Sequence, residues 1–153
     1  MLDTELFRDL PDSLLSQMSS INRKMITKVP FFSDKLRSEY FINEITKKLQ
    51  HRVYAPGSYL LYQFEKQREL FIVTSGRCDI YVKGNKEAIS SLTPGDFIGD
   101  YQLFFGTVNQ VGARAPDFTE VLVLTFEKVR TCDSLRPTKH SNTYLTLLSH
   151  VAV

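Results

Sequence analysis

The stretch "LTPGDFIGDYQLFFGTVNQVGARA", residues 92–115, contains the pattern that decides the fold. It joins a Pro-Gly turn at 94–95 to a short apolar strand end at 97–98. The next segment, "DYQLFFG", has the length and the final glycine of a helix of one to two turns. No lysine or arginine precedes Arg114 in this stretch, so no positive charge lies in its turn, in its helix or at the start of its returning strand.

On both sides of this stretch, short β-branched and aromatic segments alternate with turn residues, a pattern typical of strands. The pattern predicts a barrel or jelly roll of short antiparallel strands. Turns at 75–76 and 83–85 divide the strands, and Gly84 is placed where a hairpin needs a positive φ. The strand-forming segments are "RVYAPGSYLLYQ", "ELFIVTSGRCDIYVKGNKEAISSL", "TPGDFIGD" and "GARAPDFTEVLVLTFE".

Residues 1–50 have a helical pattern instead. A first helix, with Pro11 and Asp12 at its start, has apolar residues at spacings of four, three and four: Leu14, Met18, Ile21 and Met25. The segment "PFF" at 30–32 ends it. A second helix has its apolar residues at i, i+4 and i+8: Phe41, Ile45 and Leu49.

The composition excludes several functions. A chain of 153 residues with a formal net charge of +2 has no basic surface for nucleic acid. No apolar run is long enough to cross a bilayer, and the acidic N-terminus does not resemble a signal peptide. The two cysteines favour a reducing compartment. His51, His140 and His150 do not form a metal-binding set, and no catalytic motif occurs, so we expect no metal and no enzyme.

Three motifs in sequence order, "VYAPGSYLLYQ", "LFIVTSGRCDIYV" and "LTPGDFIGDYQLFF", resemble those of the cyclic-nucleotide-binding domain family. The leading helices, with "LP" at 10–11 and "VPFFSD" at 29–34, are similar to the end of the C-linker in cyclic-nucleotide-gated, hyperpolarisation-activated and ether-à-go-go type channels. The resemblance extends from about Leu10 to the end of the chain.

The resemblance implies an α+β fold built on an antiparallel, jelly-roll-like β-roll. Residues 1–50 would form the N-terminal helices, comprising the end of the C-linker and the first helix of the domain. Residues 51–128 would form the β-roll, and its segment 95–113 would be the phosphate cassette, the loop and short helix that hold the cyclic phosphate in this family. Residues 129–153 would form a C-terminal helical lid that is truncated here.

The resemblance also implies which residues would contact a cyclic nucleotide. Gly99 takes the position of the family's cassette glycine, and Asp100 replaces the glutamate that binds the ribose. Asn109 and Gln110 stand where the family has an arginine and a hydroxyl residue that hold the phosphate. The full set by resemblance is Ile80, Ile98, Gly99, Asp100, Tyr101, Gln102, Asn109, Gln110, Val111 and His150.

Asn109 and Gln110 predict weak binding. An arginine would give a charge-assisted, bidentate clamp on a phosphate, whereas a neutral amide gives one ordinary hydrogen bond. Loss of the clamp weakens binding by roughly 2 to 4 kcal/mol, which turns a micromolar site into one of about 30 μM to 1 mM. Arg114 does not substitute, because in a strand it points away from the face of Val111 and Ala113.

The resemblance therefore predicts a cytoplasmic regulatory domain of a membrane channel, or of a transporter such as a sodium/proton exchanger, with weak or absent affinity for cAMP and cGMP. It would need no cofactor, and other subunits could be its partners. Two alternatives stay open. One is a working cAMP or cGMP sensor with different phosphate contacts, and the other is a structural interaction module in which no ligand matters.

Overall fold

The computed structural model describes residues 9–33 and 38–132. Its helical elements are α1 (Asp12–Ile26), the 3-10 turn η2 (Pro30–Phe32), α2 (Glu39–Lys48), α3 (Asp100–Phe105) and α4 (Phe126–Arg130). Its strands are β1 (Gln50–Tyr54), β2 (Tyr59–Leu61), β3 (Glu69–Ser75), β4 (Cys78–Tyr81), β5 (Ser90–Leu92), β6 (Phe97–Ile98), β7 (Gly112–Arg114) and β8 (Thr119–Thr125). Most of the predicted C-terminal segment 129–153 lies outside the described residues.

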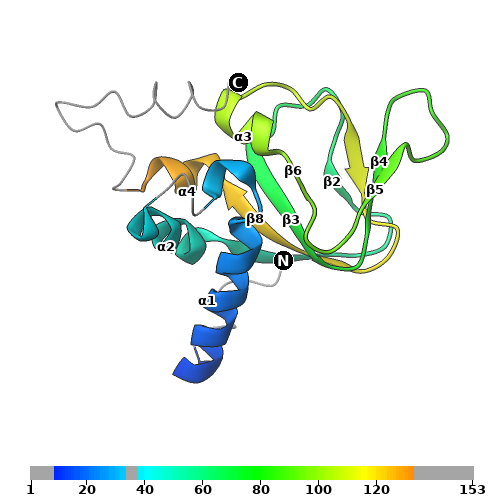
Figure 1. Ribbon diagram of the computed structural model, residues 1–153. Coiled ribbons are helices and arrows are strands. Elements are labelled where there is room, and N and C mark those ends of the chain that lie inside the picture. Colours follow the sequence, from blue (N-terminus) through cyan, green and yellow to red (C-terminus); the bar gives the residue numbers. More distant parts are fainter. Residues whose placement is uncertain (1–8, 34–37, 133–153) are drawn as a thin grey trace.

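The strands form two four-stranded antiparallel sheets, in the orders β1-β8-β3-β6 and β2-β7-β4-β5. The helices gather at one end of this roll, with α2 and α4 beside each other and α3 above them in the view of Figure 1. The predicted α+β fold with an antiparallel β-roll and a short helix within it is therefore confirmed.

The central strands of the first sheet, β8 and β3, are buried on both faces, and this explains their continuous apolar runs. Side chains of a strand alternate between faces, so neighbours enter different cores. Leu70 and Ile72 of β3 pack with the helices, whereas Phe71 and Val73 pack inside the roll. The cluster inside the roll, called the inner cluster below, contains Leu60, Leu61, Phe71, Val73, Cys78, Ile80, Ala113, Ala115, Val121 and Val123.

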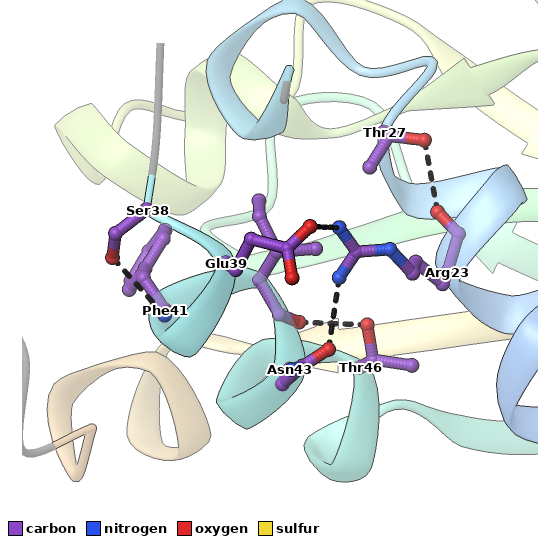
Figure 2. A network of polar contacts seen from close by, with 8 residues as sticks. Arg23, Thr27, Ser38, Glu39, Phe41, Asn43 and Thr46 are labelled. Atoms are coloured by element: carbon purple, nitrogen blue, oxygen red, sulfur yellow. Dashed lines mark hydrogen bonds and ion pairs between the residues drawn. The ribbon is translucent and has the colours of Figure 1, made fainter. Parts of the chain in front are cut away.

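A polar contact fixes α1 against α2 (Figure 2). The guanidinium of Arg23 donates to Asn43 Oδ1 at 2.8 Å and pairs with Glu39 Oε1 at 3.1 Å. At the start of α2, the Ser38 hydroxyl accepts the amide of Phe41 and caps the helix. The Arg23 guanidinium thus contacts two successive turns of α2 and ties the two helices together.

The apolar stripe of the first helix does not form a continuous buried face. Helix α1 forms as predicted, but Leu14 and Ile21 are 44% and 54% exposed. Burial begins only at the end of the helix, where Ile26 is fully buried and Met25 packs against the helical core. In Figure 1 this helix extends away from the roll, which leaves its first turns without the contacts that the spacing alone would suggest.

Burial of Cys78 in the inner cluster predicts a loss of stability in alkali. Burial, with a smaller effect of Asp79, raises the pKa of the Cys78 thiol from 9.0 to about 12. Between these values the unfolded chain ionises the thiol and the folded chain does not. The free energy of unfolding should therefore fall by up to about 1.4 kcal/mol per pH unit above about pH 9.

Urea unfolding of the protein and of Cys78→Ala, each from about pH 8 to about pH 11, measures this effect. The substitution should lower stability at the lower pH and should remove this part of the pH dependence. An equal decline in both proteins would show that Cys78 ionises as readily in the fold as in the unfolded chain.

Candidate functional site

The segment from β6 to β7 has the shape predicted for it. Strand β6 ends at Ile98, Gly99 bends the chain, and α3 runs for six residues before Gly106 ends it. Both glycines have positive φ, +98° and +64°. The extended chain then leads to β7, whose Ala113 pairs with Ile80 of β4.

Gly99 is required by packing, whether or not a ligand is present. A Cβ atom at this position would lie 2.2 Å from the carbonyl oxygen of Glu69 on β3. A φ of +98° also disfavours any other residue. Asp100 follows in the first turn of α3, where its charge is favourable to the helix dipole, although no side chain caps this helix by a hydrogen bond.

Three of the predicted site residues meet at the inner cluster. Ile80 is 6% exposed and belongs to the cluster, and Ile98 and Val111 are half-buried and pack against it. They come from β4, from β6 and from the segment before β7. The structure thus brings together an apolar surface from three separate parts of the chain.

Of the three predicted residues on α3, Tyr101 and Gln102 differ in exposure. Tyr101 is 56% exposed, and its ring lies 4.4 Å from that of Phe105 on the next turn. Gln102 is half-buried, and its carbonyl accepts the amide of Gly106 at the end of the helix. His150 lies outside the described residues.

Asn109 is part of the scaffold. Its side chain is 1% exposed, and Nδ2 donates to the carbonyl of Tyr62 at 3.0 Å. Its backbone pairs with the same loop, because Asn109 N donates to Glu65 O at 2.9 Å and Phe64 N donates to Asn109 O at 2.8 Å. Oδ1 of Asn109 is buried and accepts no hydrogen bond from the described residues. The side-chain donor is therefore committed to holding the loop between β2 and β3.

Gln110 also contributes through its backbone. Its side chain is exposed, and its carbonyl accepts Gln63 Nε2 at 2.8 Å. Together, Asn109 and Gln110 fasten the segment before β7 to the 62–65 loop. Neither brings a charge to the site.

Arg114 lies on the opposite face of β7 from Ala113, as predicted. Arg114 is exposed and Ala113 is fully buried in the inner cluster. Nε of Arg114 donates to the carbonyl of Gly57 at 3.2 Å. The cation nearest to Asn109 in the sequence therefore faces the outside of the roll.

Arg68, which the sequence did not single out, holds the other end of α3. Its Nε and Nη2 donate to the carbonyl of Leu103 at 3.1 and 2.9 Å, and Nη2 also donates to that of Phe104 at 3.0 Å. Its guanidinium carbon lies 3.4 Å from the centre of the Phe126 ring, at the start of α4. A cation at the C-terminal end of a helix satisfies free carbonyls and stabilises the dipole. One side chain thus links α3 to α4.

An aromatic contact links α3 to the N-terminal segment. The ring of Phe104 lies 3.8 Å from that of Phe31 and 5.7 Å from that of Phe32, centre to centre. The motif "PFF" of η2 therefore packs directly on the short helix. Contacts of this kind between residues more than 70 positions apart leave no local signal in a sequence.

Two kinds of feature are absent from the described part of the chain. Within residues 9–33 and 38–132, no group of three His, Cys, Asp or Glu side chains could hold a metal ion. None of the helices in these ranges has the length and apolar character needed to cross a membrane.

The comparison with known families identifies the family to which this β-roll belongs. The family model described as "Cyclic nucleotide-binding domain" matches residues 51–132. The chain belongs to the cyclic nucleotide-binding domain family. The match includes both sheets, α3 and α4, and it confirms the resemblance seen in the three sequence motifs.

The relatives of this cyclic nucleotide-binding domain include channels and a kinase subunit. It is 23% identical over 129 residues to the human potassium/sodium hyperpolarization-activated cyclic nucleotide-gated channel 4, covering 83% of this chain and 10% of the channel. It is 24% identical over 130 residues to a cyclic nucleotide-gated channel of Caenorhabditis elegans, covering 80% and 18%. A cAMP-dependent protein kinase regulatory subunit of Schizosaccharomyces pombe is 26% identical over 127 residues, covering 83% and 30%. The chain thus spans less than a third of the length of each of these relatives.

Proposed function

We propose that this cyclic nucleotide-binding domain is the intracellular regulatory part of an ion channel or a related transporter, that it catalyses no reaction, and that its own affinity for cAMP and cGMP is weak or absent. The observation that carries the low affinity is Asn109. By the resemblance it takes the position of the family's phosphate-binding arginine, it is 1% exposed, and its side-chain amide nitrogen donates to Tyr62 O.

Electrostatics around the cassette supports low affinity. A cyclic phosphate brings one negative charge, and charge-assisted hydrogen bonds from arginine are about twice as strong as neutral ones. Here the neighbouring ionisable group is Asp100, a carboxylate that repels a phosphate unless a cation lies between them. Arg68 bonds to the carbonyl end of α3, and Arg114 faces the outside of the roll. Neither is placed to neutralise a phosphate beside Gly99.

The contacts of α3 support a role in transmitting movement. Phe104 touches Phe31 of the N-terminal segment, and Arg68 joins α3 to Phe126 of α4. A shift of α3 would therefore change packing at both helical segments. Coupling of this kind requires two states with different contacts, and α3 touches both helical segments. In a channel related to the relatives named above, we propose that the N-terminal helices carry this movement to the pore.

A second candidate, a working nucleotide sensor, is favoured by the retained geometry. Gly99 has the positive φ of the cassette bend, and Ile80, Ile98 and Val111 provide an apolar surface beside it. This candidate predicts micromolar affinity despite the missing arginine.

A purely structural module instead predicts no change of the cassette amide signals in an NMR titration with millimolar cAMP.

The substitution pair Asn109→Arg and Gln110→Thr tests the missing clamp. Calorimetric titration of this variant with cAMP should give a dissociation constant at least about tenfold lower than that of the unmodified protein, because an arginine adds a charge-assisted contact to phosphate. Loss of the Asn109 bond to Tyr62 O should cost about 1 kcal/mol of stability, so folding is checked by urea unfolding.

The matched control is Val108→Arg, which adds the same charge one position away at an exposed residue. It should leave the affinity unchanged within about twofold, since a charge at the surface is screened by water and salt. An equal gain in both variants would point to general attraction, and no gain in the folded double variant would mean that the missing arginine is not what limits binding.

A further inference from the structure

A groove on the outer face of the second sheet is lined by lysine and arginine residues, which the cassette lacks. It has a volume of about 320 Å³ and is lined by Tyr59, Tyr62, Lys83, Lys86, Gly112 and Arg114, and we call it the outer groove. It lies across β2, β7 and the hairpin after β4, on the side of the sheet opposite to the inner cluster. A volume of this size lies at the lower end of the range for small-molecule sites.

One wall of the outer groove presents exposed aromatic faces. The rings of Tyr59 and Tyr62 stack at 5.0 Å with an interplanar angle of 24°, and the two residues are 42% and 50% exposed. The guanidinium of Arg114 lies 5.6 Å from the centre of the Tyr59 ring. Flat aromatic surfaces of this kind bind nucleobases by stacking, and they do so with little dependence on the base.

The groove also gathers three cations that no carboxylate neutralises in the described residues. Lys83 and Lys86 are exposed on the hairpin, and neither forms an ion pair there. Arg114 donates through Nε to Gly57 O, which leaves its Nη atoms without acceptors in the described part of the chain. Asp79 is opposite Arg114 in the register, but its carboxylate is held by Arg77 at 3.0 Å and by Ser91 at 2.7 Å.

The walls of the groove are braced by polar contacts. The Gln63 side chain accepts the amide of Lys83 and donates to the carbonyl of Gln110, so it ties the hairpin to the segment before β7. The carbonyl of Tyr62 accepts Asn109 Nδ2. Gly112 also lines the groove, and a Cβ there would make only ordinary contacts at 3.7 Å or more. A side chain can therefore be added at residue 112, within the lining of the groove, without a steric clash at its Cβ.

We propose that the outer groove binds a small phosphorylated molecule with an aromatic ring, of the class of nucleoside monophosphates. The base stacks on the Tyr59 and Tyr62 pair, and the phosphate lies among Lys83, Lys86 and Arg114. Such a ligand requires an aromatic surface for its ring and cations for its phosphate, and residues of both kinds line this one groove. This site is distinct from the apolar surface beside Gly99, because it lies on the other face of the second sheet.

The groove would also be coupled to the cassette. Tyr62 and Gln63 line or brace the groove, and the same two residues bond to Asn109 and Gln110. A ligand that orders the 62–65 loop therefore acts on the segment that holds the cassette in place. Occupancy of the groove should shift the amide signals of Asn109 and Gln110 as a secondary effect.

An NMR titration of the full chain with AMP tests the proposal. Adenosine, which lacks the phosphate charge, and inorganic pyrophosphate, which lacks the aromatic ring, serve as comparison probes. AMP should shift the amides of residues 59–63, 82–86 and 112 with a saturable curve. Adenosine and pyrophosphate should each bind at least about tenfold more weakly. The double variant Lys83→Gln, Lys86→Gln should lose at least about tenfold in affinity, and Gly112→Val, which fills the base of the groove, should abolish binding.

The matched control is the pair Lys24→Gln, Lys128→Gln, which removes the same charge from exposed positions on α1 and α4 and should leave AMP affinity unchanged. Absence of shifts with millimolar AMP would overturn the proposal. So would pyrophosphate binding as tightly as AMP, or shifts centred on residues 98–102 rather than on the groove. Tighter binding of a hexaglutamate peptide than of AMP would assign the groove to a protein partner and would equally overturn it.

Discussion

Replacement of Gly99 by alanine is expected to lower the free energy of unfolding by about 3 kcal/mol or more, one of the largest effects of a single methyl group in this domain. Two costs combine. The φ of +98° is strained for any residue with a Cβ, and that Cβ would lie 2.2 Å from the Glu69 carbonyl. Because the contact is with backbone of β3, neither side can move without disturbing the first sheet. Urea unfolding measures the loss.

Gly84 offers a matched control for this prediction. Its φ of +93° is almost the same, but a Cβ there would meet nothing within 4 Å. Gly84→Ala should therefore cost only the backbone strain, about 1 to 2 kcal/mol. The difference between the two variants isolates the packing of Gly99 against β3. Equal losses would mean that the cassette bend is not held by that contact.

Replacement of Arg68 by alanine is expected to destabilise the domain by about 2 to 4 kcal/mol and to loosen the junction of α3 with α4. The side chain donates three hydrogen bonds to the carbonyls of Leu103 and Phe104, and its guanidinium lies over Phe126. Removal leaves carbonyls at the end of α3 without partners. Urea unfolding gives the energy, and amide exchange of residues 103–106 and 126–130 reports the loosening.

Two further variants separate the role of Arg68 from a general effect of charge. Arg68→Lys keeps the charge but loses the planar fork, so it should recover only part of the stability. Arg130→Ala removes an exposed ion pair with Glu127 and should cost less than about 1 kcal/mol. If Arg68→Lys were as stable as the unmodified protein, a positive charge alone would explain the effect and the bidentate contact would not matter.

The sequence predicted the elements whose signals are local. The strands form where β-branched runs are separated by glycine turns, as the sequence predicted. Helix α3 likewise forms within the segment "DYQLFFG" and ends at its glycine. The positions of Arg114 and Ala113 on opposite faces followed from the two-residue period of a strand. Predictions of this kind need no knowledge of which parts of the chain meet.

The remaining features depend on contacts between distant residues. Asn109 was predicted as a poor phosphate ligand from its residue type, but its bond to Tyr62, 47 positions away, could not be read from the sequence. The same holds for Arg68 and α3, whose contacts join residues 35 and 36 positions apart. In α1 the period predicted the helix, but the exposure of Leu14 and Ile21 depends on how far the helix extends from the roll. The period of a sequence therefore predicts an element, and the tertiary contacts decide what its residues do.

The packing of the cassette gives the proposed low affinity a structural reason beyond the absence of an arginine at residue 109. Asn109 is nearly fully buried and its hydrogen bonds hold the 62–65 loop, so residue 109 contributes to the stability of the fold. Meanwhile Phe104 and Arg68 keep α3 in contact with the segments before and after the roll. Under the proposed function, these contacts would transmit a movement of α3, and the missing positive charge would keep a nucleotide from driving that movement.

Calorimetric titration of the unmodified protein with cAMP and with cGMP tests the central claim most directly. A neutral, buried Asn109 in place of the arginine predicts dissociation constants of about 30 μM to 1 mM, or no measurable heat, for both nucleotides. A low-micromolar dissociation constant for either nucleotide would contradict the account, because it would show that the cassette holds a phosphate tightly without the arginine.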